Sequence, residues 1–369
     1  MFALAVDPTD NQLLIAANSE GTLMRSADGG STWDSVHTGR ASVDTLAFSP
    51  FKAGLVLAGT RGAGALASRD GGLTWSTVSG LDGRTARVFA FSLTVMAAGT
   101  DHGVYVSQDG LSWSPSGLAD RSIDAIAVAA IHSPVRLIAG SDSPASGGGL
   151  PMFQSTDGGA SWTSLNAAIS GTAVLSLAAG PLPPTKDVRP LLVGTNAGLF
   201  VSTDNGASFT ALSGGGLLPS TDYTQLAFVT DHHDRFYVAS DGGGSRSGGV
   251  WRTDDAGRSF TSLAPPEPSI TALAVAYNQT PILYAATFGP ADHAAALWAY
   301  HDTGAPPQGS TGSPPPHASG SRTATASPGV TPSLLALLQK SQTPYVALGV
   351  GALVVIALAM VANFRGGRR

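Results

Sequence analysis

A short motif recurs along the chain and constrains its fold more than any other feature. The octamer SADGGSTW at residues 26–33 returns as SRDGGLTW at residues 68–75, and related copies begin at Ser107, Ser155, Ser202 and Thr253. The aspartates of the copies are Asp28, Asp70, Asp109, Asp157, Asp204 and Asp255, at intervals of 42, 39, 48, 47 and 51 residues. Intervals of this size are typical of the blades of a β-propeller.

Each repeat contains four short runs with the length and composition of β-strands. Two apolar runs precede the octamer, as in VDTLAFSP and LVLAGT before residue 68. A third run leads into the octamer, as in GVYVSQDG, and a fourth follows its aromatic residue, as in WDSV and WTSL. Because four antiparallel strands make one propeller blade, each repeat is predicted to be a blade. The 46 glycines and the 12% of charged residues also favour strands and turns over helices.

First strands of blades are predicted seven times, one more than the number of clear octamers. They span residues 2–6, 44–48, 88–91, 123–128, 174–178, 225–229 and 270–275. Aligning GVWRTDDAG with ALWAYHDTG places Trp298 on Trp251 and Asp302 on Asp255, so the seventh octamer is a degenerate copy. Its aromatic position is Pro307 and low-complexity sequence follows, which predicts a last blade without a fourth strand. The predicted fold is therefore all-β, a seven-bladed β-propeller of four-stranded antiparallel blades over residues 1–304.

The residue types of the octamer suit a tight turn between the third and fourth strands. The aspartate carboxylate can accept hydrogen bonds from amides that follow it, the glycine permits a positive φ, and the Ser or Thr hydroxyl can add a further bond. The aromatic residue then enters the fourth strand with a large apolar face to bury between blades. We predict structural roles for the six aspartates named above and for Trp33, Trp75, Trp113 and Trp162.

The spacing Ser/Thr-x-Asp-x-Gly-x-Ser/Thr-Trp/Phe resembles the Asp-box, or BNR, repeat of sialidases, sortilin-type receptors, some xyloglucan-cleaving hydrolases and photosystem II assembly factors. The resemblance covers residues 1–304, and the third copy departs from it by one deleted residue between Gly110 and Trp113. It implies that the box is structural and lies on the face opposite the usual ligand site. We therefore expect ligands on the other face, which is formed by the loops between blades and the loops from second to third strands. These are called the rim loops below.

Charged side chains are frequent in the rim loops. The predicted ligand-binding residues are Arg40, Arg61, Arg84, Arg87, Arg121 and Arg246. Interspersed with them are Asp82, Asp101, Asp120, Asp142, Asp222 and Asp241. Arginine suits planar, bidentate recognition of a carboxylate or phosphate. A rigid platform with such loops is expected to bind a protein, peptide or glycan partner, as the resemblance to sortilin-type receptors and assembly factors implies.

The alternative is a surface glycoside hydrolase, sialidase-like or of another BNR type. Such an enzyme needs an arginine cluster for a substrate carboxylate, or a pair of carboxyl groups that flank the scissile bond. The weak catalytic candidates are Asp82, Asp120, Asp222 and Tyr223. For the first two, solvated turn residues are the favoured interpretation. The early Arg-Ile-Pro motif of sialidases has no counterpart in the sequence, so a binding protein is favoured over an enzyme.

Other ligand classes have less support in the sequence. The run TDHHDR at residues 230–235 holds metal-ligand residue types, but adjacent side chains on a strand point apart, so a solvated loop is favoured over a metal site. The glycine-rich stretches lack a phosphate-binding motif followed by a helix. The formal net charge of −5 offers no broad basic surface, and there is no cysteine. We predict no metal, no cofactor and no nucleic-acid partner.

The C-terminal part of the chain has the composition of a membrane anchor. Residues 305–343 are a Pro/Ser/Gly/Thr-rich tether with a short apolar segment, residues 344–364 a predicted transmembrane helix, and residues 365–369 a basic tail. Tyr345 to Phe364 is free of charge over 20 residues, enough helix to cross a bilayer. Three arginines follow this segment and one lysine precedes it, so the tail is expected in the cytoplasm and the propeller outside, on a single-pass protein of a bacterial cell membrane.

The N-terminus does not read as an export signal. MFALAVDPTD has neither a basic start nor an apolar core and already resembles a blade strand. We therefore expect coding sequence upstream of Met1 that supplies a signal segment and a strand to complete the last blade. The alternative is a tail-anchored protein whose propeller stays in the cytoplasm.

Overall fold

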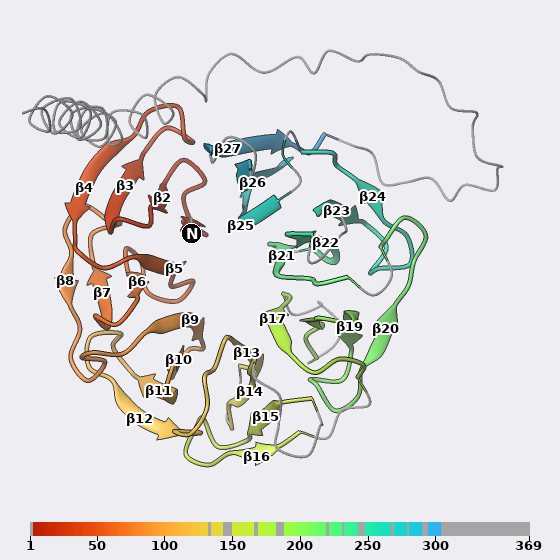
Figure 1. Ribbon diagram of the computed structural model, residues 1–369, viewed down its shortest axis with the longest axis horizontal. Coiled ribbons are helices and arrows are strands. Elements are labelled where there is room, and N and C mark those ends of the chain that lie inside the picture. The colour runs from red at the N-terminus through yellow and green to blue at the C-terminus, as the bar shows by residue number, and fades with distance from the viewer. Residues whose placement is uncertain are drawn as a thin grey trace, which may run out of the picture.

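The computed structural model describes residues 3–303 except 132–133, 143–149, 166–168, 182–187, 219–220, 231, 243–247, 266, 268, 279 and 290–293. Within these residues, 27 strands form seven antiparallel sheets, arranged as blades around a central channel (Figure 1). The first strand of each blade lies next to the channel and the later strands lie progressively farther out. The predicted all-β, seven-bladed propeller is confirmed.

The first four blades each contain four strands in sequence order. Blade one contains β1 (Ala3–Val6), β2 (Leu14–Ala17), β3 (Thr22–Ser26) and β4 (Asp34–Thr38). Blade two contains β5 (Val43–Phe48), β6 (Val56–Thr60), β7 (Ala65–Ser68) and β8 (Ser76–Thr77). Blade three contains β9 (Ala86–Phe91), β10 (Met96–Thr100), β11 (Gly103–Ser107) and β12 (Ser114–Gly117). Blade four contains β13 (Ala125–Ala130), β14 (Arg136–Gly140), β15 (Met152–Ser155) and β16 (Thr163–Ser164).

Blades five and six contain four strands each, and blade seven contains three within the described residues. Blade five contains β17 (Val174–Ala179), β18 (Leu191–Thr195), β19 (Gly198–Ser202) and β20 (Thr210–Leu212). Blade six contains β21 (Gln225–Val229), β22 (His232–Ser240), β23 (Gly249–Thr253) and β24 (Thr261–Ser262). Blade seven contains β25 (Ser269–Asn278), β26 (Thr280–Gly289) and β27 (Ala294–His301). No strand within the described residues pairs with the outer edge of β27, which agrees with the degenerate seventh octamer.

In β6, β10 and β18, the penultimate residue of the second strand is a glycine that lets the next blade approach closely. All five residues of β6, β10 and β18 are buried. A Cβ on Gly59 would lie 2.3 Å from the Ala86 carbonyl oxygen, and one on Gly194 would lie 2.1 Å from the Tyr223 carbonyl oxygen. Both distances are far shorter than a van der Waals contact, so a larger residue here would push neighbouring blades apart.

Apolar side chains fill the seams between consecutive blades, and an octamer aromatic enters six of the seven seams. Trp33 packs in the seam between blades seven and one, Trp113 in the seam between blades two and three, and Phe260 in the seam between blades five and six. The remaining three are Trp75, Trp162 and Phe209. The seam between blades six and seven, named the 6/7 seam below, takes no octamer aromatic from the described residues.

The octamers form the turns from third to fourth strands. In the second copy, Asp70 Oδ1 accepts hydrogen bonds from the Thr74 amide (2.9 Å) and the Ser68 hydroxyl (2.7 Å), and Oδ2 accepts one from the Thr74 hydroxyl (2.6 Å). The indole N–H of Trp75 donates to the Gly72 carbonyl at 3.0 Å. The third copy, which is one residue shorter, keeps its aspartate and shifts the pattern, because Asp109 accepts from the amides of two following residues at 2.8 and 2.9 Å.

The predicted membrane anchor lies outside the described residues, as do the tether and the basic tail. Within the described residues, no helix has the length and apolar character needed to cross a membrane.

Candidate functional site

The rim loops share one face of the propeller. The Arg61 amide donates to the Ser42 carbonyl at 2.9 Å, and the Ile123 amide donates to the Thr100 carbonyl at 2.8 Å, so loops between blades are bonded to loops from second to third strands. Because successive strands of a blade are antiparallel, the octamer turns lie at the opposite end of the sheets. The structure therefore separates the octamer aspartates from the rim loops.

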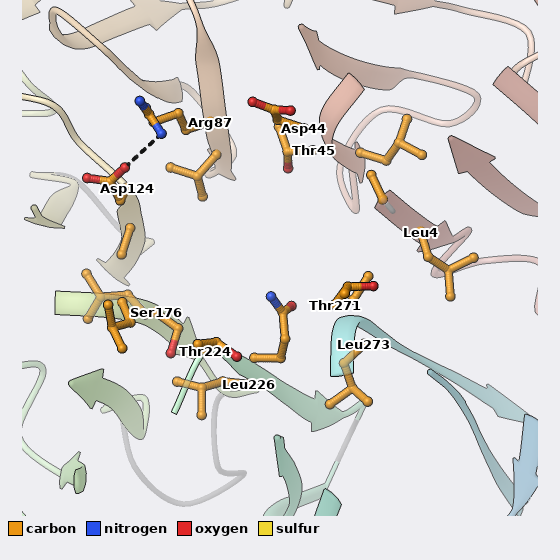
Figure 2. Close-up of a pocket in the computed structure, with 18 residues that line it drawn as sticks. Leu4, Asp44, Thr45, Arg87, Asp124, Ser176, Thr224, Leu226, Thr271 and Leu273 are labelled. Atoms are coloured by element: carbon orange, nitrogen blue, oxygen red, sulfur yellow. Dashed lines mark ion pairs between the residues drawn. The ribbon is translucent and has the colours of Figure 1, made fainter. Parts of the chain in front are cut away.

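The central channel contains a cavity. This cavity, of about 240 Å³, is lined by residues at or just before the first strands of all seven blades (Figure 2). Its polar lining residues are Asp44, Thr45, Arg87, Asp124, Ser176, Thr224, Gln225 and Thr271. The end of the cavity that faces the rim loops, where Asp44, Arg87 and Asp124 lie, is named the channel mouth below.

Charged residues of the channel mouth come from blades two, three and four. Asp44 binds the Arg61 guanidinium in bidentate geometry, with Nε–Oδ2 at 3.1 Å and Nη2–Oδ1 at 3.2 Å. Arg87 reaches across to blade four, where its Nη1 lies 3.3 Å from Asp124 Oδ1 (Figure 2). The carboxylate of Asp44 is 6% exposed, whereas the Arg61 side chain is 59% exposed. The carboxylates of Asp44 and Asp124 are thus largely buried, whereas the Arg61 guanidinium is exposed to solvent.

Asp124 has an unusual electrostatic environment. Burial raises the pKa of its carboxyl group, the Asp142 carboxylate adds to the rise, and the Asp142 amide and the Arg87 guanidinium oppose it. The Asp142 amide donates to Asp124 Oδ2 at 3.0 Å. The pKa of Asp124 therefore depends on two charged neighbours, the Asp142 carboxylate and the Arg87 guanidinium.

The opposite wall of the channel is neutral. It is lined by leucines and by the hydroxyls of blades five, six and seven. The Ser176 hydroxyl donates to the Tyr223 carbonyl at 2.8 Å, and the Thr271 hydroxyl donates to the Ala286 carbonyl at 3.3 Å. The Thr224 hydroxyl is buried and has no hydrogen-bond partner among the described residues. One side of the mouth is therefore charged, and the other offers a hydroxyl.

Of the five predicted arginines within the described residues, Arg87 lines the channel mouth, and Arg61 binds Asp44, which also lines it. The guanidinium carbon of Arg121 lies 5.3 Å from the centre of the Phe153 ring, a cation–π contact away from the mouth. Arg40 is exposed in a loop between blades. The Arg84 amide donates to the Leu81 carbonyl of its own loop at 3.0 Å, and the Arg84 carbonyl accepts from the Gly64 amide of the loop from β6 to β7 at 2.8 Å. Arg246 lies outside the described residues.

The weak catalytic candidates do not assemble into one site. Asp82 accepts a hydrogen bond from the Gly80 amide at 3.3 Å, as a turn residue does. Asp120 is exposed. Tyr223 lies in a loop between blades, as expected, but its side chain is fully buried and donates to the Leu218 carbonyl at 2.6 Å, so it does not face the rim surface. Burial raises the pKa of Asp222, and Asp241 adds to the rise.

Sequence reasoning missed Asp44 and Asp124. Both residues were assigned to apolar first strands, in VDTLAF and IDAIAV. The signal that could have revealed them is one charged residue at the same strand position in three consecutive blades, the third being Arg87 of ARVFAF.

In the run at residues 230–235, two side chains of metal-ligand types lie close together, with His233 Nε2 3.2 Å from Asp234 Oδ2. Asp231 lies outside the described residues. In the described part of the chain, no three His, Asp or Glu side chains are placed to hold a metal ion.

Comparisons with known proteins identify the fold. No protein-family model and no curated protein matches the chain. Among solved structures, a GH74 xyloglucanase from Xanthomonas campestris is 14% identical with a TM-score of 0.59, over 80% of this chain and 53% of that one. YCF48 from Cyanidioschyzon merolae is 16% identical with a TM-score of 0.54, over 81% of this chain and 94% of that one. YCF48 bound to D1 peptide is 16% identical with the same TM-score of 0.54, over 77% and 89%.

These likenesses place the chain among seven-bladed β-propellers. The chain spans about half the length of the xyloglucanase and most of the length of YCF48. At 14 to 16% identity they establish the architecture. Function has to be argued from the site itself.

Proposed function

We propose that this propeller is a binding platform for a protein or peptide partner, which docks on the rim face and anchors in the channel mouth. The observation that carries the proposal is the pair of ion pairs, Asp44 with Arg61 and Arg87 with Asp124, at one side of the channel. YCF48, one of the structural neighbours, is known bound to a D1 peptide, which supports a peptide partner. A glycan is the second class of ligand that the rim loops could accept.

The chemistry of the mouth favours a ligand that carries a carboxylate. Arg61 is more than half exposed and already binds a carboxylate through its Nε and Nη2 groups, so an incoming carboxylate can take the place of Asp44. Arg87 can likewise leave Asp124, which then takes up a proton more readily because the opposing cation is gone. The buried Thr224 hydroxyl supplies a donor on the neutral wall.

We also propose that residues 344–364 tether the platform to a cell membrane, with the propeller on the outer side. The uncharged run from Tyr345 to Phe364 and the arginines that follow it support this topology. The chain has no cysteine, so single cysteines placed at Thr303 and at Gly367 can be labelled with a membrane-impermeant maleimide on intact cells. Labelling at residue 303 alone is expected. Labelling at residue 367 alone would support the tail-anchored alternative, because a single span places residues 303 and 367 on opposite sides of the membrane.

A glycoside hydrolase remains the second candidate, and one observation favours it. Asp124 is a buried carboxyl group with a raised pKa beside the carboxylate of Asp142, as a general acid requires. Hydrolysis of xyloglucan or sialyl substrates that disappears in Asp124→Asn would support this candidate. Binding of peptides without any hydrolysis would support the platform.

The test of the proposed function is a peptide and glycan array probed with the full chain in detergent micelles. The hits are then measured with Arg87→Gln and with Arg40→Gln, a matched exposed arginine outside the mouth. Loss of one charge-assisted carboxylate contact is expected to weaken binding about tenfold or more for Arg87→Gln, with little change for Arg40→Gln. Equal binding by both variants would place the ligand elsewhere.

A further inference from the structure

Exposed apolar side chains occur on one face of the propeller. Within the described residues, three large apolar side chains are exposed, Phe51 at 40%, Leu73 at 54% and Leu93 at 59%. Phe51 and Leu93 lie in the loops from first to second strands of blades two and three, and Leu73 lies in the octamer of blade two. In an antiparallel blade these loops and the octamer turns lie at the same end, which is named the octamer face below. All three side chains therefore lie opposite the rim loops, on two blades that are neighbours in the ring (Figure 1).

Blade one shows that the fold does not need apolar side chains at two of these positions. Its sequence DPTDNQL before β2 corresponds to SPFKAGL before β6, and each loop is closed by a bond of 2.9 Å from the amide of its first residue to the carbonyl of its last. Thr9 therefore stands where blade two has Phe51. In the octamers, Ser31 stands where blade two has Leu73. Because the same turns form with polar residues, the two apolar side chains of blade two require another explanation.

Charged residues at the same positions differ between the two blades in one direction. Lys52 and Arg69 are exposed, and the Lys52 ammonium donates to the Gln108 carbonyl in the octamer of blade three at 2.6 Å. The corresponding residues of blade one are Asp10 and Ala27. The octamer aspartate is common to both blades, so blade two carries two added cations and one anion fewer. Exposed apolar side chains beside lysine and arginine are typical of a surface that binds anionic phospholipids.

The described chain ends on the octamer face. β27 is the third strand of blade seven, and third strands run from the rim to the octamer turns. Asp302, which follows β27, aligns with the octamer aspartate Asp255. Thr303 therefore lies on the face that carries the exposed apolar side chains, and the sequence then continues to residues 344–364, the proposed membrane span. A propeller tethered through this end has its octamer face nearer to the point of attachment than its rim face.

We propose that the octamer face of blades two and three docks on the surface of an anionic lipid bilayer. Phe51, Leu73 and Leu93 enter the boundary between headgroups and acyl chains, and Lys52 and Arg69 bind lipid phosphates. The inference rests on the proposed tether, which holds the face near the membrane at an effective concentration on the order of millimolar, so that weak contacts suffice. Docking by this face turns the rim loops and the channel mouth away from the bilayer, toward a partner.

The experiment uses the full chain in phosphatidylcholine vesicles with and without phosphatidylglycerol. Because the chain has no cysteine, Thr94→Cys, next to Leu93, carries a single fluorescent label on the octamer face, and Asp120→Cys carries it on a rim loop. Lipids with a nitroxide near the headgroup quench labels that lie at the bilayer surface. With phosphatidylglycerol present, we expect the label on the octamer face to be quenched about twofold or more, and the label on the rim loop to be quenched little.

Substitutions by the residues of blade one test the contributing side chains. Phe51→Thr with Leu73→Ser should reduce the quenching on the octamer face to the level on the rim, and circular dichroism should be retained because blade one forms the same turns with these residues. Lys52→Asp should reduce the quenching only where phosphatidylglycerol is present. Thr9→Ser with Ser31→Thr is the matched control on blade one and should leave the quenching unchanged.

Three results would overturn the proposal. The first is equal quenching of the labels on the octamer face and on the rim. The second is quenching that persists in the Phe51→Thr, Leu73→Ser variant. The third is a label on the octamer face that becomes shielded from aqueous iodide in detergent as the protein concentration rises, which would make a second copy the occupant.

The proposed tether and the proposed platform are judged by other readouts. Extraction of the chain from vesicles by alkaline carbonate would contradict the membrane span, whereas the quenching decides whether the octamer face meets the bilayer. Arg87→Gln should weaken peptide binding at the channel mouth and leave the quenching unchanged, because Arg87 lines the channel and the labelled loop lies on the octamer face.

Discussion

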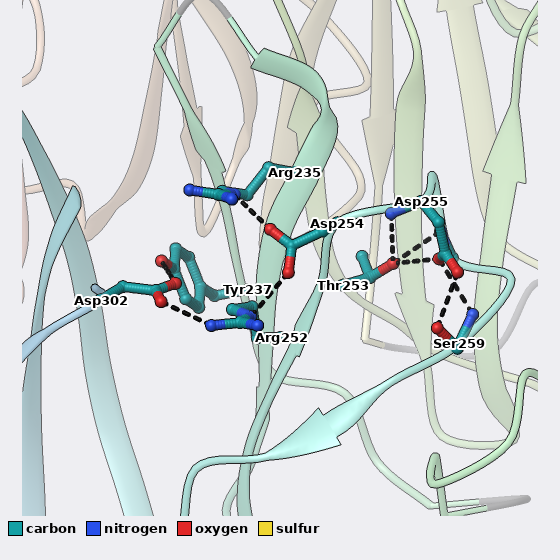
Figure 3. A network of polar contacts seen from close by, with 9 residues as sticks. Arg235, Tyr237, Arg252, Thr253, Asp254, Asp255, Ser259 and Asp302 are labelled. Atoms are coloured by element: carbon teal, nitrogen blue, oxygen red, sulfur yellow. Dashed lines mark hydrogen bonds and ion pairs between the residues drawn. The ribbon is translucent and has the colours of Figure 1, made fainter. Parts of the chain in front are cut away.

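The Tyr237 hydroxyl donates a hydrogen bond to the Asp302 carboxylate at 2.5 Å, across the seam between blades six and seven (Figure 3). Asp302 also forms an ion pair with Arg252, and Arg252 lies 2.8 Å from Asp254. Arg235 binds the same Asp254. Burial raises the pKa of Tyr237, and its bond to Asp302 adds to the rise, so the phenol keeps the proton that it donates. The 6/7 seam therefore contains a continuous series of buried polar contacts, from Tyr237 through Asp302 and Arg252 to Asp254.

Asp302 shows how a degenerate repeat acquires another role. Its counterpart Asp255 accepts hydrogen bonds from the Ser259 amide and hydroxyl in its own octamer turn, at 2.9 and 2.6 Å (Figure 3). Asp302 instead bonds to two residues of the neighbouring blade. The same residue type at the same repeat position thus stabilises a turn in one blade and a seam in the next.

The first prediction concerns this network. Asp302→Asn leaves the buried Arg252 with one carboxylate fewer, and breaking a buried ion pair typically costs about 3–5 kcal/mol. The matched control, Asp255→Asn, removes an acceptor from a turn that is partly exposed and should cost about 1 kcal/mol. Urea unfolding of both variants measures the difference. Equal losses of free energy would show that the network adds nothing beyond a turn bond.

The second prediction concerns acid. Hydrogen bonds from the Thr74 and Ser68 hydroxyls lower the pKa of Asp70 from 3.8 to about 2, and the Ser161 hydroxyl and amide lower the pKa of Asp157 to the same value. A carboxyl group with a depressed folded pKa stabilises the fold above its unfolded pKa and loses this contribution as pH falls through the folded value. The melting temperature should therefore fall between about pH 4 and about pH 2.

The variant Asp70→Asn measures how much one octamer turn contributes to this loss of stability in acid. At pH 7 the variant should be less stable than the wild type by about 1 kcal/mol, and the difference should shrink as the wild-type carboxylate is protonated. Asp120→Asn, at an exposed rim position, is the control and should leave the melting temperature unchanged. A constant difference between Asp70→Asn and wild type down to pH 2 would contradict the assignment.

The third prediction uses two glycines of one loop between blades two and three. Gly80 and Gly83 both have positive φ, of 86° and 71°. A Cβ on Gly80 would lie 1.9 Å from the Trp113 carbonyl oxygen, but one on Gly83 would meet nothing within 4 Å. Gly83→Ala should cost about 1 kcal/mol from backbone strain alone. Gly80→Ala should cost several kcal/mol or prevent folding, and equal melting temperatures would show that the blades can move apart there.

The fold could be predicted from the sequence because each octamer marks a fixed position in its blade. The octamer marks the turn from the third to the fourth strand, and the apolar runs around it have the length of strands. The number of blades and the order of their strands could therefore be predicted. The degenerate copy at Asp302 even predicted the three-stranded seventh sheet. The Tyr237–Asp302 contact was beyond reach, because it joins residues 65 positions apart whose meeting depends on how two blades pack.

The candidate site was predicted only in part. Arg61 and Arg87 were selected because they lie in or beside rim loops, yet their partners Asp44 and Asp124 lie in or just before strands that read as apolar. A side chain that points into a central channel is polar for a reason that one blade does not reveal, since the channel exists only when seven blades close. The burial of Tyr223 could not be predicted for a related reason. It lies in a loop between blades, yet its side chain points inward and packs in the seam between blades five and six.

The last prediction tests the electrostatics of the channel mouth without a ligand. Arg87→Gln removes the cation that favours the ionised form of Asp124, so the pKa of that carboxyl group should rise further. Asp142→Asn removes the neighbouring anion but keeps the backbone amide that donates to Asp124, so the pKa should fall. Carboxyl NMR titration of the two variants and the wild type measures both shifts. The order of pKa values should be Arg87→Gln above wild type above Asp142→Asn. Any other order would mean that Asp124 does not share its proton affinity with these two neighbours, and the exchange of partners proposed for the mouth would lose its basis.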